Sequence, residues 1–310
     1  MPNRRSFVKT VAAGVGFAAS RSAVFAQAPQ RNGPLRVELP DGVGLPSGWR
    51  QMRKLDAHSH VDADLHTAHA DWQSTEDLIA AAEILGIDRL YCSRPITGGV
   101  MAEIDAVRTA NDSVLAAMEK FPQRIAGYCF VQPGNGQAAL DEIDRCLEAG
   151  MIGVKLYNQY KINTQTVFPV IEKCIELQVP ILSHSAYLTD AESKAAQPRT
   201  SHAGDFCDVS ARYPEAMFVL GHINGGGDWE WAIRTLRDCP NVYLDTSGSV
   251  QEYDTIGDCA EMLGHQRLLF ATDLTMEGGV GKILSADLTP EAREAIFWRN
   301  FQNLLDRRKT

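Results

Sequence analysis

From residue 53 onward, the chain alternates between two kinds of hydrophobic pattern. Short runs rich in β-branched and aromatic residues are followed by longer stretches in which apolar residues recur every three or four positions, and Gly or Pro precedes the next run. Helical spacing is clear at residues 75–85, 103–120, 137–149 and 290–305. The short runs predict eight strands, at residues 54–61, 89–93, 125–131, 153–157, 180–185, 217–223, 242–247 and 268–273.

The regular alternation of strand and helix predicts a parallel sheet. Neighbouring parallel strands need a long crossover, usually a helix, and nearly continuous apolar strands fit a sheet that helices cover. Eight such units in about 250 residues match the size of one (β/α)8 barrel, whereas an open doubly wound sheet usually carries a glycine-rich phosphate loop after its first strand. The sequence has no such loop there. We therefore predict an α/β fold with a single (β/α)8 TIM barrel at residues 53–310 and a short N-terminal arm at residues 29–52.

The first 28 residues differ in character from the rest. The pair Arg4-Arg5 precedes a weakly apolar run without acidic residues, which ends in small residues of the kind that signal peptidase recognises. This pattern is typical of a bacterial export signal of the twin-arginine type. The uncharged stretch between Lys9 and Arg21 is far shorter than the roughly 20 residues of a membrane span. We expect residues 1–28 to be an export signal, the mature protein to be periplasmic, and no stable membrane span.

The net charge indicates which kinds of partner to expect, and the cysteine content indicates whether disulfides are needed. The net charge is −9, and removal of residues 1–28, which hold four basic residues and no acidic one, makes it −13. An acidic body argues against nucleic acid as a partner and favours a small-molecule substrate. The seven cysteines include no CxxC pair, and we expect small buried apolar groups rather than required disulfides. The sequence leaves open whether the chain forms a homo-oligomer.

Polar residues gather at the C-terminal ends of the predicted strands, where the active site of such a barrel lies. His58 and His60 end the first strand, and they point the same way because side chains alternate along a strand. His184, His222 and Asp273 end the fifth, sixth and eighth strands. Imidazole nitrogen and carboxylate oxygen suit zinc, and also manganese or iron. These strand ends therefore predict a metal centre.

One further acid accompanies the histidine pair. Asp56 precedes His58 by two residues on the same face of the predicted strand. Histidines that bind metals usually donate their second ring N–H to a carboxylate or carbonyl. We therefore expect Asp56 to orient an imidazole without touching the metal.

The order of these motifs resembles the amidohydrolase superfamily. An HxH pair followed by His, His and Asp on strands one, five, six and eight is similar to that superfamily's pattern, and the resemblance covers residues 53–306. Local phrases are similar to the amidohydrolase-related branch (the amidohydrolase 2 family), which includes aminocarboxymuconate semialdehyde decarboxylase, resorcylate decarboxylases and lactonases. The phrases are Gly153-Val154-Lys155-Leu156-Tyr157, Gly221-His222, Asn241-Val242-Tyr243-Leu244-Asp245-Thr246-Ser247 and Leu269-Phe270-Ala271-Thr272-Asp273.

The resemblance implies a role for each strand-end residue. His58, His60, His184 and Asp273 would bind one divalent metal ion, with zinc expected first and manganese or iron as alternatives. His222 would sit beside the metal-activated water. Asp273 and His222 are then the expected catalytic residues, because the carboxylate can carry a proton to the leaving group and the imidazole can stabilise an oxyanion.

Three functions fit these residues. The leading hypothesis is a metal-dependent hydrolase that uses activated water on the lactone, ester or amide carbonyl of a small organic acid. The first alternative is a metal-dependent decarboxylase, a carbon–carbon lyase acting on an aromatic or enoic acid. The second is a periplasmic binding protein that uses the metal to hold its ligand. Family membership by itself does not decide among reactions.

Other residues are candidates for the substrate pocket. Lys155, at the end of the fourth strand, occupies the position where two-metal relatives carry a carboxylated lysine that bridges both ions. We favour a plain amine there, paired with a carboxylate of the site or substrate. Arg94 is a candidate clamp for a substrate carboxylate. Tyr157, Asn224 and Tyr187 lie on loops at the same end of the predicted barrel.

Overall fold

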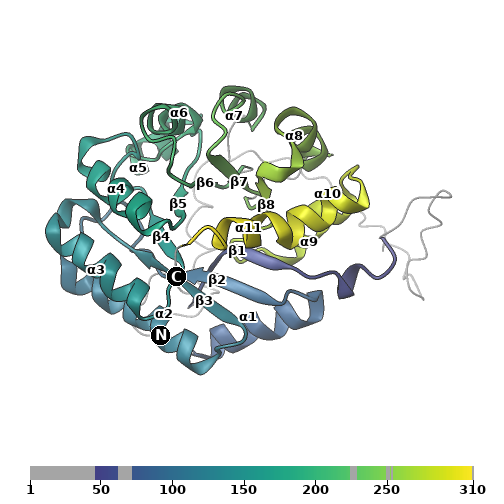
Figure 1. Cartoon of the computed structure of the whole chain (residues 1–310), viewed down its shortest axis with the longest axis horizontal. Coiled ribbons are helices and arrows are strands. Elements are labelled where there is room, and N and C mark those ends of the chain that lie inside the picture. The colour runs from purple at the N-terminus through teal and green to yellow at the C-terminus, as the bar shows by residue number, and fades with distance from the viewer. Residues whose placement is uncertain (1–45, 62–71, 224–228, 249–251, 253, 309–310) are drawn as a thin grey trace, which may run out of the picture. The chain divides into compact units, whose positions relative to one another are not determined.

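The eight predicted strands form one continuous parallel sheet in chain order (Figure 1). The computed structural model describes residues 46–61, 72–223, 229–248, 252 and 254–308. Each strand pairs in parallel with the next. The strands are β1 (Leu55–His60), β2 (Arg89–Ser93), β3 (Ile125–Phe130), β4 (Gly153–Leu156), β5 (Ile181–His184), β6 (Phe218–Gly221), β7 (Val242–Asp245) and β8 (Leu268–Leu269).

Helices connect successive strands and surround the sheet in Figure 1, as expected for crossovers between parallel neighbours. The prediction of a (β/α)8 barrel is confirmed. The helices are α1 (Trp72–Leu85), α2 (Ile104–Lys120), α3 (Gln137–Glu148), α4 (Phe168–Leu177), α5 (Ala191–Ala196), α6 (Ala203–Arg212), α7 (Trp229–Thr235), α8 (Thr255–Leu263), α9 (Met276–Ser285), α10 (Pro290–Glu294) and α11 (Asn300–Leu305), with a π-helical turn, Ala295–Arg299, joining the last two.

The barrel closes through contacts between the first strand and the segment that follows β8. The Ala57 N–H donates to the Phe270 carbonyl at 2.9 Å, and the Asp273 N–H donates to the His58 carbonyl at 2.8 Å. The carboxylate of Asp56 also accepts from the backbone N–H and the hydroxyl of Thr272, at 2.9 and 2.6 Å. The regular part of β8 therefore ends at Leu269, before the predicted end at residue 273, because these contacts take the place of a continuous hydrogen-bond ladder.

The core has two parts, as a covered barrel requires. Apolar residues between the sheet and the helices form the larger cluster, to which Leu90, Phe218 and Phe270 contribute side chains with no solvent exposure. A smaller cluster includes Tyr128, Leu182 and residues of α11. Removing one such aromatic side chain costs about 3–5 kcal/mol of stability, because transfer free energy is lost and a cavity is left.

A buried lysine fixes the entry of the chain into β1. Lys54 has no solvent exposure, and its ammonium donates to the carbonyls of Trp49 and Met52 at 2.7 and 2.8 Å. It lies 3.3 Å from the Gly86 carbonyl as well. These contacts place the end of the predicted arm beneath the barrel. The expected export signal at residues 1–28 lies outside the described residues.

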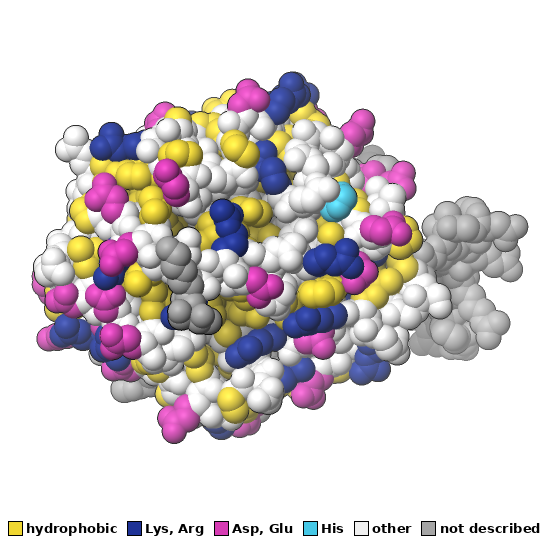
Figure 2. All heavy atoms as spheres, viewed as in Figure 1, with side chains coloured by type: hydrophobic (Ala, Val, Ile, Leu, Met, Phe, Trp, Pro, Cys, Tyr) yellow, Lys and Arg dark blue, Asp and Glu magenta, His cyan; other side chains and the backbone are white. Residues whose placement is uncertain are grey.

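The surface shows mixed charge. Figure 2 shows basic and acidic side chains interspersed with apolar ones over the face in view. Among the described residues, no helix combines the length and apolar character that crossing a bilayer requires.

Candidate metal centre

The two histidines of β1 are each held through their Nδ1 atoms. His58 Nδ1 lies 2.7 Å from a carboxylate oxygen of Asp245, the last residue of β7. His60 Nδ1 lies 3.1 Å from the Ser93 carbonyl at the end of β2. Because a carboxylate and a carbonyl only accept hydrogen bonds, Nδ1 is the donor in both contacts, and the Nε2 atom of each ring faces the centre. Both rings are therefore oriented as metal ligands.

Those two Nε2 atoms converge on Asp273. The Asp273 Oδ1 atom lies 2.9 Å from His60 Nε2 and 3.7 Å from His58 Nε2. Burial lowers the pKa of His58 to about 3, with Lys155 adding to the effect, so the ring is neutral. Burial opposes ionisation of Asp273, but His222, His58 and His60 outweigh it and hold its pKa well below the usual range. A neutral His58 ring facing an ionised Asp273 carboxylate is the combination of protonation states that metal binding requires.

A hydrogen-bonded relay sets the protonation of the other two histidines. The Ser247 hydroxyl donates to Asp245 Oδ1, so it accepts from His222 Nδ1 at 2.8 Å. The His222 Nε2 atom then accepts from His184 Nδ1 at 2.9 Å. His184 is left with an unprotonated Nε2 atom. The relay therefore gives His184 the same ligand form as the histidines of β1.

Asp245 is the functional residue that the sequence analysis did not single out. One of its oxygens accepts from His58, and the other accepts from the backbone N–H groups of His222 and Ser247 and from the Ser247 hydroxyl. Asp245 is the last residue of β7 and lies in the sequence motif at residues 241–247 that resembles the family. The strand-end argument could therefore have identified it. An acid after Tyr243-Leu244 also fits an ordinary strand end, so its residue type alone does not mark it as functional.

Asp56 has a different role from the expected one. Its carboxylate accepts from the backbone N–H groups of His58 and Thr272 and from the Thr272 hydroxyl. The acid that faces the His58 imidazole is Asp245. Asp56 therefore ties β1 to the end of β8, and the expectation that it orients an imidazole was wrong. Alternation along β1 placed it on the correct face, but a bulge in the pairing with β2 between Asp56 and Ser59 changes the local direction of the chain.

Lys155 lies inside the centre rather than at its edge. The side chain has no solvent exposure, and its Nζ atom lies 2.5 Å from His58 Nε2. Burial lowers the pKa of Lys155 to about 8, although Asp273 and Asp245 favour the charged form. The amine is therefore close enough to contact any group bound between the β1 histidines and Asp273.

The backbone of the site adopts conformations that few residues tolerate. His222, Asp273 and Leu274 have φ angles of 83°, 47° and 72°. Non-glycine residues in this region cost of order 1–3 kcal/mol each, and such residues concentrate at functional sites. Here the turns after β6 and β8 bring the His222 Nδ1 atom within 3.5 Å of Asp273 Oδ2.

Two groups of side chains come close enough to hold a metal ion in this region: His58 with His60 and Asp273, and His58 with His222 and Asp245. In the second group both oxygens of Asp245 already accept hydrogen bonds. In the first group the Nε2 atoms of both histidines face Asp273. The first group therefore fits a divalent ion better, and His184 belongs to neither group.

The remaining candidates differ in burial and in their contacts with the centre. The Tyr157 ring stacks on His184 at 4.3 Å between centroids. Arg94 is buried directly after β2. Tyr187 is 42% exposed and lines the hollows beside the centre. Asn224 lies outside the described residues.

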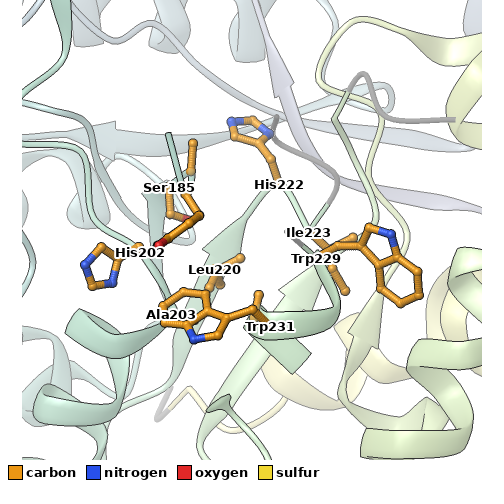
Figure 3. A pocket seen from close by; sticks show the side chains of 11 residues that line it. Ser185, His202, Ala203, Leu220, His222, Ile223, Trp229 and Trp231 are labelled. Carbon is orange, nitrogen blue, oxygen red and sulfur yellow. The ribbon is translucent and has the colours of Figure 1, made fainter. Parts of the chain in front are cut away.

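Two adjoining hollows lie beside Tyr187, and the inner one reaches His222. The inner hollow has a volume of about 20 Å³ and is lined by His222, Trp229 and Trp231, with Ser185, His202 and Ala203 around it (Figure 3). The outer hollow, of about 400 Å³, shares Ala186, Tyr187 and His202 with the inner one. Space next to the centre is therefore narrow, and it widens past Tyr187.

Solved structures of several enzymes share this fold. A 2,6-dihydroxybenzoate decarboxylase from Rhizobium is 17% identical and superposes with a TM-score of 0.64 over 82% of this chain and 98% of its own. A dihydroxybenzoic acid decarboxylase from Polaromonas with bound manganese is 19% identical, with a TM-score of 0.61 over 82% and 96%. A 4-oxalomesaconate hydratase from Rhodopseudomonas palustris is 18% identical, with a TM-score of 0.62 over 82% and 96%.

No curated protein sequence matches this chain. The family model described as amidohydrolase does match, over residues 55–307, which is nearly the whole predicted barrel. The order of the strand-end motifs and this match agree, and the chain therefore belongs to the amidohydrolase family.

Proposed function

We propose that this protein is a metal-dependent hydrolase that acts on a lactone, ester or amide carbonyl of a small organic acid. The observation that carries the proposal is the convergence of His58 Nε2 and His60 Nε2 on Asp273 Oδ1. His184 is proposed as the fourth ligand, because the relay through His222 leaves its Nε2 atom unprotonated. Zinc is the expected ion, and the manganese in one structure with the same fold makes manganese a real alternative.

A divalent ion held there would polarise the substrate carbonyl and make a water molecule nucleophilic near neutral pH. The chain itself supplies the proton transfer. Asp273 has a side chain that is 31% exposed, so solvent reaches it, and its ionised carboxylate can accept the proton of the attacking water and return it to the leaving group. His222 Nδ1 carries the only proton of its ring and lies 3.5 Å from Asp273 Oδ2, so we propose that this N–H turns from Ser247 to the developing oxyanion during the reaction.

The hollows define the size and charge of the substrate. The outer hollow, of about 400 Å³, has room for a small molecule, and the inner hollow connects it to His222. Lys161 and Lys194 line the outer hollow, and Lys161 also pairs with Asp205 at 3.0 Å. Two basic side chains in an otherwise acidic protein favour an anionic substrate. This supports an organic acid whose second polar group lies past Tyr187.

Decarboxylation is the second candidate, and two observations favour it. Two of the three solved structures compared above are decarboxylases of dihydroxybenzoates. The buried cations Lys155 and Arg94 lie at the strand ends beside the centre, where they could hold a carboxylate. In this reaction a proton must reach the carbon that loses carbon dioxide, and Asp273 or His222 is the donor that the geometry offers.

One experiment separates the candidates. The protein, reconstituted with zinc or with manganese, is incubated with carboxylated lactones and with hydroxybenzoates while acid release and carbon dioxide are measured in parallel. We expect acid release from a lactone without carbon dioxide, and none from the Asp273→Asn variant. Carbon dioxide released in proportion to substrate loss would establish the lyase instead. Tight binding of a panel member without turnover would favour the third possibility, a binding protein.

We also propose that the protein acts in the periplasm. The Arg4-Arg5 pair and the apolar run that follows it support export by the twin-arginine route. Replacing both arginines with lysine should leave the protein in the cytoplasm, which cell fractionation measures.

A further inference from the structure

Two cysteines face each other behind the wall of the inner hollow. Cys207 lies within α6, and Cys239 follows α7. Their Sγ atoms are 2.8 Å apart, and Cys207 Sγ also lies 3.2 Å from the carbonyl of Thr235, the last residue of α7. A disulfide bond needs an Sγ–Sγ distance of about 2.05 Å, so a small side-chain movement would form it.

The other cysteines differ from this pair in access. All five are fully enclosed in the core, whereas Cys207 is partly exposed. Cys129 and Cys146 also lie close together, but both contact Glu142: Cys146 donates to its carboxylate at 3.3 Å and Cys129 donates to its carbonyl at 3.7 Å. A soluble oxidant therefore reaches Cys207 without opening the core and does not reach Cys129 or Cys146.

We propose that Cys207 and Cys239 form a disulfide bond when the folded protein meets a disulfide oxidant. Cys207 attacks one sulfur of the oxidant and releases the other as a thiol, and Cys239 then attacks the mixed disulfide. The protein loses two thiol protons and two electrons, and the oxidant disulfide is reduced to two thiols. The export expected from Arg4-Arg5 would bring the folded chain to an oxidising compartment, but the pairing rests on the geometry alone.

The disulfide bond would connect α6 to the segment after α7, and both helices line the inner hollow. The 32-residue separation between the two cysteines includes β6 and His222. The first turn of α6 contributes Ala203 to the inner hollow, and α7 contributes Trp229 and Trp231 (Figure 3). A covalent link between α6 and the segment after α7 would therefore fix these two helices of the hollow relative to each other. The strand β6, which leads into His222, lies between them in the sequence.

The reaction should be slow with weak oxidants. Burial and the neighbouring Cys239 thiol raise the pKa of Cys207 to about 12, so little thiolate is present at neutral pH. Since the thiolate is the attacking form, bond formation should become faster as the pH rises.

The test uses the folded wild-type protein. It is treated with glutathione disulfide at pH 8.5, unfolded in the presence of iodoacetamide, digested and mapped by mass spectrometry. We expect five alkylated cysteines and one cross-linked peptide pair that joins Cys207 to Cys239. Alkylation of all seven cysteines, stable glutathione adducts, or a link between Cys129 and Cys146 would overturn the proposal.

Stability provides an independent readout. Closing a loop of this length typically shifts an unfolding equilibrium by roughly 30- to 1,000-fold, so oxidation should raise the melting temperature by several degrees and reduction should reverse the rise. The Cys207→Ser and Cys239→Ser variants should lose this redox-dependent shift. The matched control Cys259→Ser, in the buried face of α8, should keep it. A shift that survives in both serine variants would show that another pair is responsible.

Discussion

The carboxylate of Asp245 contacts His58 Nδ1 at 2.7 Å and, through the Ser247 hydroxyl, begins the relay that reaches His184. The three histidines proposed as ligands lie on β1 and β5, and the protonation of two of them, His58 and His184, therefore depends on one acid on β7. Burial opposes ionisation of Asp245, but His58, His222 and Ser247 outweigh it and hold its pKa below the usual range. Asp245 therefore stays ionised and is the final acceptor of the relay.

We expect Asp245→Asn to weaken metal binding by about 10- to 100-fold, the usual effect of losing a partner of a ligating histidine. The backbone N–H groups of His222 and Ser247 need an acceptor, so the oxygen of the new amide faces them. Its NH2 group then faces His58. His58 must then accept at Nδ1 and protonate Nε2, which prevents ligation. Competition with a metal-sensitive dye measures the affinity.

Two further variants make this result specific. Ser247→Ala interrupts the relay but leaves the bond between Asp245 and His58, so its loss of affinity should be smaller. The exposed Asp258→Asn on α8 should have none. Equal affinities for all three variants and the wild type would contradict the assignment of Asp245 as a positioning residue.

The number of metal ions bound per chain distinguishes a plain Lys155 amine from a carboxylated Lys155. Its Nζ atom lies 2.5 Å from His58 Nε2, which suits a plain amine beside one ion. We expect the purified mature protein to hold close to one equivalent of divalent metal by elemental analysis. A chelator should remove both the metal and the activity, and the melting temperature should fall because an ion that binds the folded state stabilises it.

Two tightly held equivalents would contradict the plain amine and would make Lys155 a carboxylated bridging ligand. The Lys155→Met variant checks this directly. It should keep one equivalent if the amine is plain, and it should lose metal if the lysine is a bridge.

Glu142 offers a prediction about pH that is independent of the metal. Glu142 lies on α3, and its buried side chain accepts from Asn111 of α2 at 2.8 Å and from two nitrogens of Arg145. Burial would raise its pKa, but the bonds from Arg145, Asn111 and Cys146 outweigh it, and the pKa is lowered. A carboxyl with a lowered pKa in the folded state contributes stability above its unfolded value, about 4.3, and loses that contribution as the pH falls through the folded pKa.

We therefore expect Glu142→Gln to be less stable than the wild type at pH 7, by about 1–3 kcal/mol for the lost charged hydrogen bonds. The difference should shrink as the pH falls below about 4.3. Melting temperatures from pH 7 to pH 3 measure it, with the exposed neighbour Asp141→Asn as control. A difference that stays constant over this range would show that the charge of Glu142 is not involved.

Most of the fold could be predicted from the sequence because each strand and helix has a local signature. The run at residues 89–93 matches β2, and the helical spacing at residues 103–120 matches α2 within one residue. The ends of strands were less predictable. The run at 268–273 is apolar from residue 268 to residue 271, but regular pairing in β8 stops at Leu269, because the barrel closes through isolated backbone bonds and the Asp56 side chain instead of a regular ladder.

The site could be predicted as a set of strand-end residues but not as a network. Polar residues after apolar runs located His58, His60, His184, His222 and Asp273, since all strand ends of a parallel barrel meet at one end. The partner of each residue depends on side-chain contacts across strands that are far apart in sequence. Asp245 lies 187 residues from His58, and no local pattern indicates that the two meet.

The last prediction separates the roles of His222 and Asp273. His222 contacts His184 and Ser247 at hydrogen-bonding distances of 2.9 and 2.8 Å, so both of its ring nitrogens already have a partner, and its Nδ1 atom lies 3.5 Å from Asp273 Oδ2. We therefore expect His222→Asn to keep its metal while turnover falls by about 10² to 10⁴, as for a lost acid–base or oxyanion group. Asp273→Asn should lose metal and turnover together, because the change removes both the ligand charge and the proton carrier.

Metal content and rate must be measured on the same preparations, with His184→Asn as the reference for a lost ligand. The asparagine at position 222 can still accept a hydrogen bond from His184 Nδ1, so the orientation of that ring should survive in His222→Asn. If His222→Asn loses the metal as readily as His184→Asn does, His222 is itself a ligand. The group formed by His58, His222 and Asp245 would then be the metal site, and the proposed division between ligands and catalytic residues would have to be reversed.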